Sequence, residues 1–277
     1  MSDPLPPDLS PIDRLRALMT RLRDRESGCP WDVEQDFSSV APYTIEEAYE
    51  VADAIARGDM AGLRNELGDL LFQVIFHAEM AREAGLFDLD DVAREVTDKM
   101  IRRHPHVFGD AAIADAAEQT RAWEEHKAAE REAAAAAQGR RPSVLDGVTR
   151  GIPALSRAMK LQRRAARVGF DWARCADVLA KIREELDEIE AEMTESPCRA
   201  RLEDELGDLL FAAVNLARVR DLDPEEALRR ANAKFERRFR KVEEALAEKG
   251  KMPSESDLEE MDRLWDAVKR AETPASR

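Results

Sequence analysis

The sequence predicts an all-α protein built from two copies of one helical domain. Ala, Leu, Glu and Arg, which favour helices, dominate a chain of 277 residues with an aromatic content of only 5%. We find no convincing alternation of apolar and polar residues of the kind that is typical of strands. The heptapeptide Glu-Leu-Gly-Asp-Leu-Leu-Phe occurs twice, at 66–72 and at 205–211. An identical recurrence of this length is not expected by chance, and it therefore indicates an internal duplication.

Helix signals divide the first half of the chain into segments. Ser10 and Pro11 are typical of an N-cap and a first helical residue, and Gly28 ends the helix that follows them. Residues 31–43 are expected to form a loop with short turns, and Thr44 is expected to cap the next helix. The other helices of this half are expected at 44–56, 60–83, 88–103 and 111–138.

Helical spacing continues in the second half. Between Leu179 and Met193, apolar residues recur at steps of three and four, which indicates an amphipathic helix. Pro224 suits the first turn of a later helix. The helices of this half are expected at 179–193, 202–220, 224–249 and 257–270.

The two halves align over more than the heptapeptide. Trp-Asp at 31–32 falls opposite Phe-Asp at 170–171, and a Lys/Arg pair follows the repeat in both halves. The segment Gly-Arg-Arg-Pro-Ser at 139–143 breaks the helical pattern between them. We therefore expect an N-terminal domain of residues 1–138 and a C-terminal domain of residues 139–277.

Composition excludes several classes of protein. Acidic residues outnumber basic ones by 58 to 43, giving a net charge of −15, which argues against nucleic acid as a partner. No apolar run approaches the ~18 residues of a membrane helix, and residues 1–11 lack the apolar core of a signal peptide. Cys29, Cys175 and Cys198 show no paired or metal-ligand spacing, which indicates reduced thiols. A cytoplasmic protein without a membrane partner is expected.

Each half carries four carboxylates at helical spacing. In each heptapeptide a Glu and an Asp stand three residues apart, and an earlier pair of Glu residues has the same spacing. The acids are Glu185, Glu188, Glu205 and Asp208 in the second half and Glu47, Glu50, Glu66 and Asp69 in the first. Four carboxylates on neighbouring helices repel one another unless a cation lies between them. Carboxylate oxygens suit Mg²⁺, with Mn²⁺ as an alternative.

Cationic residues follow the acids. Lys234 and Arg238 are four residues apart, so both side chains can reach one anion, and Lys99 and Arg103 stand opposite them in the first half. Asn232 and Lys269 can add donors. Acids that hold a metal and cations that hold phosphates are the groups that metal-assisted phosphoanhydride hydrolysis uses.

Simpler interpretations apply to some of these features. Charged helix faces are usually solvated, although Gly207, in the middle of the repeat, suggests that another helix or a ligand passes close to it. Phe170, Trp172 and Trp265 either stack on a base or pack in a core or an interface.

Several sequence motifs, taken together, resemble those of a known protein family. The pattern E-E-x-x-E followed by E-x-x-D occurs at 46–50 and 66–69, and again at 184–188 and 205–208. Cys-Pro-Trp-Asp stands at 29–32, Arg-His-Pro-His-Val-Phe-Gly at 103–109 and Val-Gly-Phe-Asp-Trp at 168–172. Together these motifs resemble the two-domain MazG family of nucleoside triphosphate pyrophosphohydrolases over nearly the whole chain.

The resemblance implies an intertwined homodimer of all-α domains that uses Mg²⁺ to hydrolyse NTPs or dNTPs to the monophosphate and pyrophosphate. It also implies metal binding by Glu185, Glu188, Glu205 and Asp208, and phosphate binding by Lys234 and Arg238. The further nucleotide contacts that it implies are Asp204, Trp265, Lys269 and Lys127.

The relative roles of the two halves stay open at this stage. Thr97 stands where the second half has Asn232, and we assign Trp265 and Lys269 no counterpart in the first half. The second half is therefore expected to be the main catalytic one. The alternatives are a narrow dNTP or dUTP house-cleaning pyrophosphatase and a catalytically silent nucleotide-sensing module that signals through its dimer.

Overall fold

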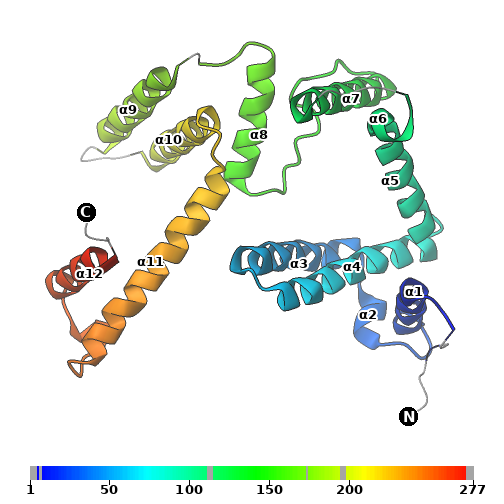
Figure 1. Cartoon of the computed structure of the whole chain (residues 1–277), viewed down its shortest axis with the longest axis horizontal. Coiled ribbons are helices and arrows are strands. Elements are labelled where there is room, and N and C mark those ends of the chain that lie inside the picture. Colours follow the sequence, from blue (N-terminus) through cyan, green and yellow to red (C-terminus); the bar gives the residue numbers. More distant parts are fainter. Residues whose placement is uncertain (1–4, 6–7, 111–114, 173, 194–197, 273–277) are drawn as a thin grey trace. The chain divides into compact units, whose positions relative to one another are not determined.

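The protein is described here by a computed structural model that covers residues 5, 8–110, 115–172, 174–193 and 198–272. Its regular elements are all helices within these residues (Figure 1). The predicted all-α class is therefore confirmed.

The chain divides into two compact units, Met1–Glu124 and Glu125–Arg277. This division falls inside one long helix, α7 (Ala116–Ala137). Residues 111–114 of the helix expected at 111–138 lie outside the described residues. The domain boundary predicted after Gln138 stays a prediction.

In the first unit, the helical pair formed by α3 and α4 is the central feature (Figure 1). Gly58 joins the two helices in a left-handed conformation (φ 69°), which glycine adopts without strain. Helices α1 and α5 both pack against α4. The helices of this unit that precede α7 are α1 (Pro11–Leu22), α2 (Pro30–Glu34), α3 (Phe37–Arg57), α4 (Met60–Glu83), α5 (Leu89–Arg103) and α6 (Pro105–Phe108).

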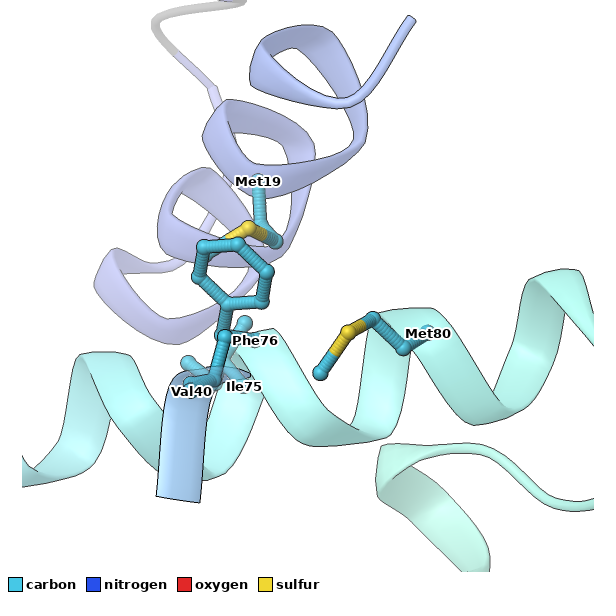
Figure 2. Packing of buried hydrophobic residues seen from close by; sticks show 5 residues of the cluster. All are labelled: Met19, Val40, Ile75, Phe76 and Met80. Atoms are coloured by element: carbon cyan, nitrogen blue, oxygen red, sulfur yellow. The ribbon is translucent and has the colours of Figure 1, made fainter. Parts of the chain in front are cut away.

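Apolar side chains from three helices form the core of this unit (Figure 2). Met19 comes from α1, Val40 from α3, and Ile75, Phe76 and Met80 from α4. All five are at most 5% exposed. Their burial holds α1 against the α3–α4 pair, because removing apolar surface from water is the main favourable term in folding.

The second unit repeats the helical pair as α9 and α10. Helix α10 packs against both α9 and α8, and α12 packs against α11 (Figure 1). The elements are α8 (Ala154–Arg167), α9 (Cys175–Glu192), α10 (Arg199–Val219), α11 (Pro224–Ala247), the short 3₁₀ helix η1 (Pro253–Glu255) and α12 (Leu258–Glu272). We call α1–α7 the first copy and α8–α12 the second copy of the duplicated unit.

The start of α3 was predicted wrongly. Residues 31–43 contain the short helix α2 and the first two turns of α3, and Thr44 lies inside α3 instead of capping it. Asp36 is the N-cap: its carboxylate accepts from the Ser39 backbone N–H, and the Ser39 hydroxyl accepts from the Asp36 N–H. This reciprocal capping box satisfies backbone donors at the start of α3, and Pro42 lies inside the helix.

Among the described residues, no helix combines the length and the apolar character that crossing a membrane requires.

Candidate functional site

Three acids of the second copy converge where α9 and α10 pack together. Glu185 is buried, with 3% of its surface exposed, while Glu205 is half-buried and Asp208 is exposed. One carboxylate oxygen of each residue lies within 4.8 Å of the other two. The spacing of these acids in the sequence therefore does place their carboxylates in one cluster. We call this cluster the second acid triplet.

Glu188, the fourth predicted acid, lies beside this triplet. Loss of hydration raises the pKa of Glu188 above its usual value, and a hydrogen bond shared with Glu185 raises it further. Asp204, which was expected to contact the nucleotide, is exposed on α10 and is not a member of the triplet.

The first copy builds the same arrangement from α3 and α4. Glu47, Glu66 and Asp69 form the first acid triplet, with one oxygen of each within 4.8 Å of the others. Loss of hydration and then the charge of Asp69 raise the pKa of Glu47. Loss of hydration and then the charge of Glu66 raise the pKa of Glu50. Like charges therefore crowd one another in this copy.

The residues of both triplets fit a hard divalent cation. Every available ligand atom is a carboxylate oxygen, the donor type that Mg²⁺ and Mn²⁺ prefer. In the second triplet the innermost ligand, Glu185, is buried, so its negative charge needs a cationic partner to be stable there.

Sequence reasoning missed one such partner, Lys181. Its Nζ lies 2.8 Å from Glu185 Oε1 and 2.8 Å from Glu184 Oε1. These carboxylates raise the pKa of Lys181, so it stays charged. A lysine four residues before a metal-ligand candidate on the same helix was the available signal. In the first copy, Tyr43 stands at this position, so the two triplets differ by one neighbouring positive charge.

The predicted cations of α11 make contacts of their own with α12. Arg238 Nε donates to Glu272 Oε2 at 2.8 Å, and its guanidinium lies 5.9 Å from the centre of the Trp265 ring. Arg238, followed by Arg237, lowers the pKa of Glu272 to about 2. The structure thus brings the predicted Arg238 and Trp265 together, and it pairs Arg238 with Glu272 of α12.

The other predicted donors lie on the same two helices. Lys234 and Asn232 are exposed on α11. Lys269 Nζ lies 2.7 Å from Asp266 Oδ1 on α12. The structure therefore collects Asn232, Lys234, Arg238, Trp265 and Lys269 on the α11–α12 pair.

The first copy has an arginine–tryptophan contact as well, which corrects the expectation that Trp265 has no counterpart. The Arg103 guanidinium lies 5.4 Å from the centre of the Trp123 ring on α7. Arg103 stands opposite Arg238 in the repeat, and Lys127 follows Trp123 at the four-residue spacing that separates Lys269 from Trp265. The W-x-x-x-K pattern in both halves was the overlooked signal.

The two glycines of the repeated heptapeptide have open space beside them. A Cβ atom added to Gly207 or to Gly68 would meet no atom within 4 Å outside its own stretch of helix. The close approach expected at Gly207 is therefore not made by any described part of this chain.

A cavity of about 220 Å³ opens beside the second acid triplet. Lys181, Glu185 and Asp208 line its polar side, and Trp172 and Phe211 line its apolar side. A small polar ligand can therefore reach two members of the triplet and the lysine together.

Comparisons with known proteins agree with the duplication. A model of the MazG nucleotide pyrophosphohydrolase domain matches residues 35–108 and 175–243, and each segment contains one acid triplet. The nucleoside triphosphate pyrophosphohydrolase of Escherichia coli (strain K12) is 51% identical over 265 residues, which are 95% of this chain and 99% of that protein. The nucleoside triphosphate pyrophosphohydrolase/pyrophosphatase MazG of Thermotoga maritima is 42% identical over 259 residues, 93% of this chain and 95% of that protein.

Proposed function

Because this chain belongs to the MazG nucleotide pyrophosphohydrolase family, we propose that it hydrolyses nucleoside triphosphates to the monophosphate and pyrophosphate with Mg²⁺. The observation that carries this proposal is the second acid triplet, in which Glu185, Glu205 and Asp208 converge beside a cavity. The first acid triplet supports a second metal site at Glu47, Glu66 and Asp69, with Glu50 beside it.

The acid triplet would hold the metal, with Glu188 adjacent. When bound, the cation supplies positive charge next to the triphosphate and polarises its phosphoryl oxygens. Glu185 holds its position because it is buried and paired with Lys181. A glutamate of this set accepts the proton of the water that attacks the α-phosphorus.

Cationic side chains of the chain complete the proposed reaction. Lys181 keeps a positive charge at the acids, where it can meet a phosphate entering the cavity. Lys234 and Arg238 offset the charge that develops on the departing pyrophosphate, and Asn232 and Lys269 add donors. Trp265 and Lys127 are proposed as further nucleotide contacts, with Asp204 at the edge of the acid cluster.

We expect purified protein with Mg²⁺ to convert ATP or dATP to the monophosphate plus pyrophosphate. Removal of the metal with EDTA should stop the reaction, because the acid triplet alone repels the triphosphate. Chromatography of the nucleotide products, with separate assays for pyrophosphate and orthophosphate, tests this over a panel of NTPs and dNTPs. Release of orthophosphate and a nucleoside diphosphate as first products would exclude the proposed reaction. Binding without turnover would favour the sensing module.

We also propose that the chain forms a homodimer through the faces of its helical pairs. Large apolar side chains remain exposed on these helices, among them Leu67 and Leu71 on α4 and Leu206 and Leu210 on α10. Each of the four is at least 41% exposed, so both copies present an apolar face. A second copy of the chain is the occupant proposed here, because closed two-fold pairs bury the same face of both partners. An intertwined arrangement of two chains would bury the apolar faces of both copies at once.

Light scattering during gel filtration should give a particle of twice the 31.2 kDa chain mass. Replacing Leu206 and Leu210 by Glu should shift that particle toward the monomer, since buried charges oppose association. The exposed Leu258 of α12 (80% exposed) serves as the control position. A fully active monomer at micromolar concentration would contradict the proposal.

The three cysteines of the chain are all free. This observation supports the proposal that the enzyme works in a reducing compartment such as the cytoplasm.

A further inference from the structure

Helix α12 packs against α11 and brings a carboxylate to Arg238, the arginine that is proposed to hold phosphate (Figure 1). Glu272 Oε2 accepts from Arg238 Nε at 2.8 Å. The other carboxylate oxygen, Oε1, lies 3.3 Å from Arg237 Nε and 3.5 Å from Lys241 Nζ. One carboxylate therefore meets three cations, so this group of four side chains keeps a net positive charge that favours an anion.

The ion pair of Arg238 with Glu272 is partly shielded from water. Their side chains are 20% and 18% exposed, whereas those of the Arg263–Glu259 pair on α12 are 70% and 82% exposed. Ion pairs on an open surface contribute little, because water and salt screen them. Hydrogen bonds from Arg238 and then Arg237 lower the pKa of Glu272 to about 2, so its carboxylate is ionised at neutral pH. A fixed negative charge therefore stands beside Arg238.

The contact with Glu272 also sets the direction in which the Arg238 guanidinium points. The hydrogen bond uses Nε, so it leaves both terminal Nη groups to other acceptors. The guanidinium carbon lies 5.9 Å from the centre of the Trp265 ring, which itself lies 5.3 Å from the Phe235 ring. An arginine held through Nε and against an aromatic ring presents its two Nη groups as a planar fork, which matches two phosphate oxygens.

The glutamate belongs to a sequence pattern that both halves of the chain share. The pattern W-x-x-x-K-x-x-E occurs at 265–272 and again at 123–130. Its three residues are spaced by four and then by three, so they lie on one face of a helix. In each half an arginine contacts the tryptophan of the pattern, Arg238 in the second and Arg103 in the first. The duplication therefore carries the glutamate together with the arginine–tryptophan contact.

We propose that Glu272 is a positioning residue that orients Arg238 so that its two Nη groups face the departing pyrophosphate. This inference rests on the proposed function, in which Arg238 offsets the charge that develops on that group. Donors that are oriented in advance stabilise developing charge well, because they need not reorganise during the reaction. Without Glu272 the guanidinium is free to turn, so stabilisation of the transition state falls while the nucleotide still binds through the metal and the other cations.

Three variants of the full-length chain test this role. Glu272→Gln removes the charge at nearly the same volume, and Glu272→Asp keeps the charge on a side chain that is shorter by one methylene. Glu259→Gln is the matched control, because it removes the charge of an exposed ion pair on the same helix. Pyrophosphate release from ATP with Mg²⁺ gives kcat and KM, and thermal unfolding followed by circular dichroism gives Tm.

Glu272→Gln should lower kcat about tenfold and change KM by less than about twofold, as expected for an interaction made only in the transition state. Glu272→Asp should keep at least about a third of the wild-type kcat, and Glu259→Gln should match the wild type. Loosening of α12 would instead raise KM and lower Tm, since Trp265 and Lys269 lie on that helix. That result would overturn the proposal, as would a higher kcat or a lower KM in Glu272→Gln.

A double-mutant cycle tests whether Glu272 acts through Arg238. Arg238→Ala should lower kcat by more than Glu272→Gln does, because it removes the donors themselves. In the Arg238→Ala background, Glu272→Gln should change kcat by less than about twofold, since effects that pass through one group are not additive. Additive losses of kcat would show that Glu272 acts elsewhere and would overturn the proposal.

Calorimetry with inorganic pyrophosphate and Mg²⁺ separates this inference from the proposed function, because it requires no turnover. Free pyrophosphate carries the charge that develops on the leaving group, so Glu272→Gln should raise its Kd about fivefold. A wild type that binds pyrophosphate without cleaving ATP would refute the reaction only, and the weaker binding by Glu272→Gln would still support the positioning of Arg238. An unchanged Kd in this variant, or no pyrophosphate binding by the wild type, would overturn the inference.

Discussion

Glu205→Gln is expected to lower kcat by about three orders of magnitude, on the scale of several kcal/mol of transition-state stabilisation. Glu205 is half-buried on α10, and one of its oxygens lies within 4.8 Å of ligand atoms from Glu185 and Asp208. Gln keeps nearly the same volume but removes the negative charge. The fold should therefore persist while the affinity of the triplet for a divalent cation falls. Steady-state kinetics of pyrophosphate release over a range of Mg²⁺ concentrations would measure both effects.

The matched substitution in the first copy is Glu66→Gln. It removes the same charge from the same position of the repeat, and we expect it to lower kcat by less than about tenfold. The second copy has Lys181 paired with Glu185 and a cavity beside the acids, whereas the first copy has Tyr43 at the position of Lys181. If Glu66→Gln abolishes turnover and Glu205→Gln stays near wild type, the first copy is the main catalytic one.

Phe76→Ala is expected to destabilise the first unit by about 3–5 kcal/mol. The Phe76 ring is 2% exposed, packs with Met19, Val40 and Ile75, and has the Arg23 guanidinium 5.3 Å from its centre (Figure 2). Removing it leaves a cavity between α1 and α4 and takes an aromatic neighbour away from a buried cation. Urea unfolding followed by circular dichroism gives the change in the free energy of unfolding.

Phe108→Ala provides the comparison for that measurement. Phe108 is 63% exposed at the end of α6, so its loss should change stability by less than about 1 kcal/mol. Equal destabilisation by both substitutions would show that burial in the α1–α3–α4 core is not what makes Phe76 important.

Patterns within single helices were sufficient to predict much of the fold. The bounds of α4, Met60–Glu83, agree with the expected helix 60–83, because Asp59 caps its start and Gly85 (φ 67°) ends it. The acid triplets were also predictable, since helical spacing places both members of each pair on one face. The start of α3 was missed because Thr44 was taken as the N-cap, whereas the capping box is formed by Asp36 and Ser39.

Contacts between distant segments could not be predicted in the same way. The pairing of Arg238 with Glu272 depends on how α12 folds back on α11, and periodicity carries no information about that turn. The Arg103–Trp123 contact joins α5 to α7 through an intervening segment. The cavity beside the second acid triplet combines α9, α10 and Trp172, so only the assembled unit reveals it.

The open space beside Gly68 and Gly207 bears on the thermal stability of this protein. Glycine inside a helix is less favourable than alanine by about 1 kcal/mol, and here no neighbouring atom of the chain would obstruct a methyl group. The folded chain alone would therefore be more heat-resistant with alanine at both positions. With glycine in both copies the chain is less resistant to heat. Proteins accept such a loss of stability where a ligand or a second subunit needs direct access to the main chain.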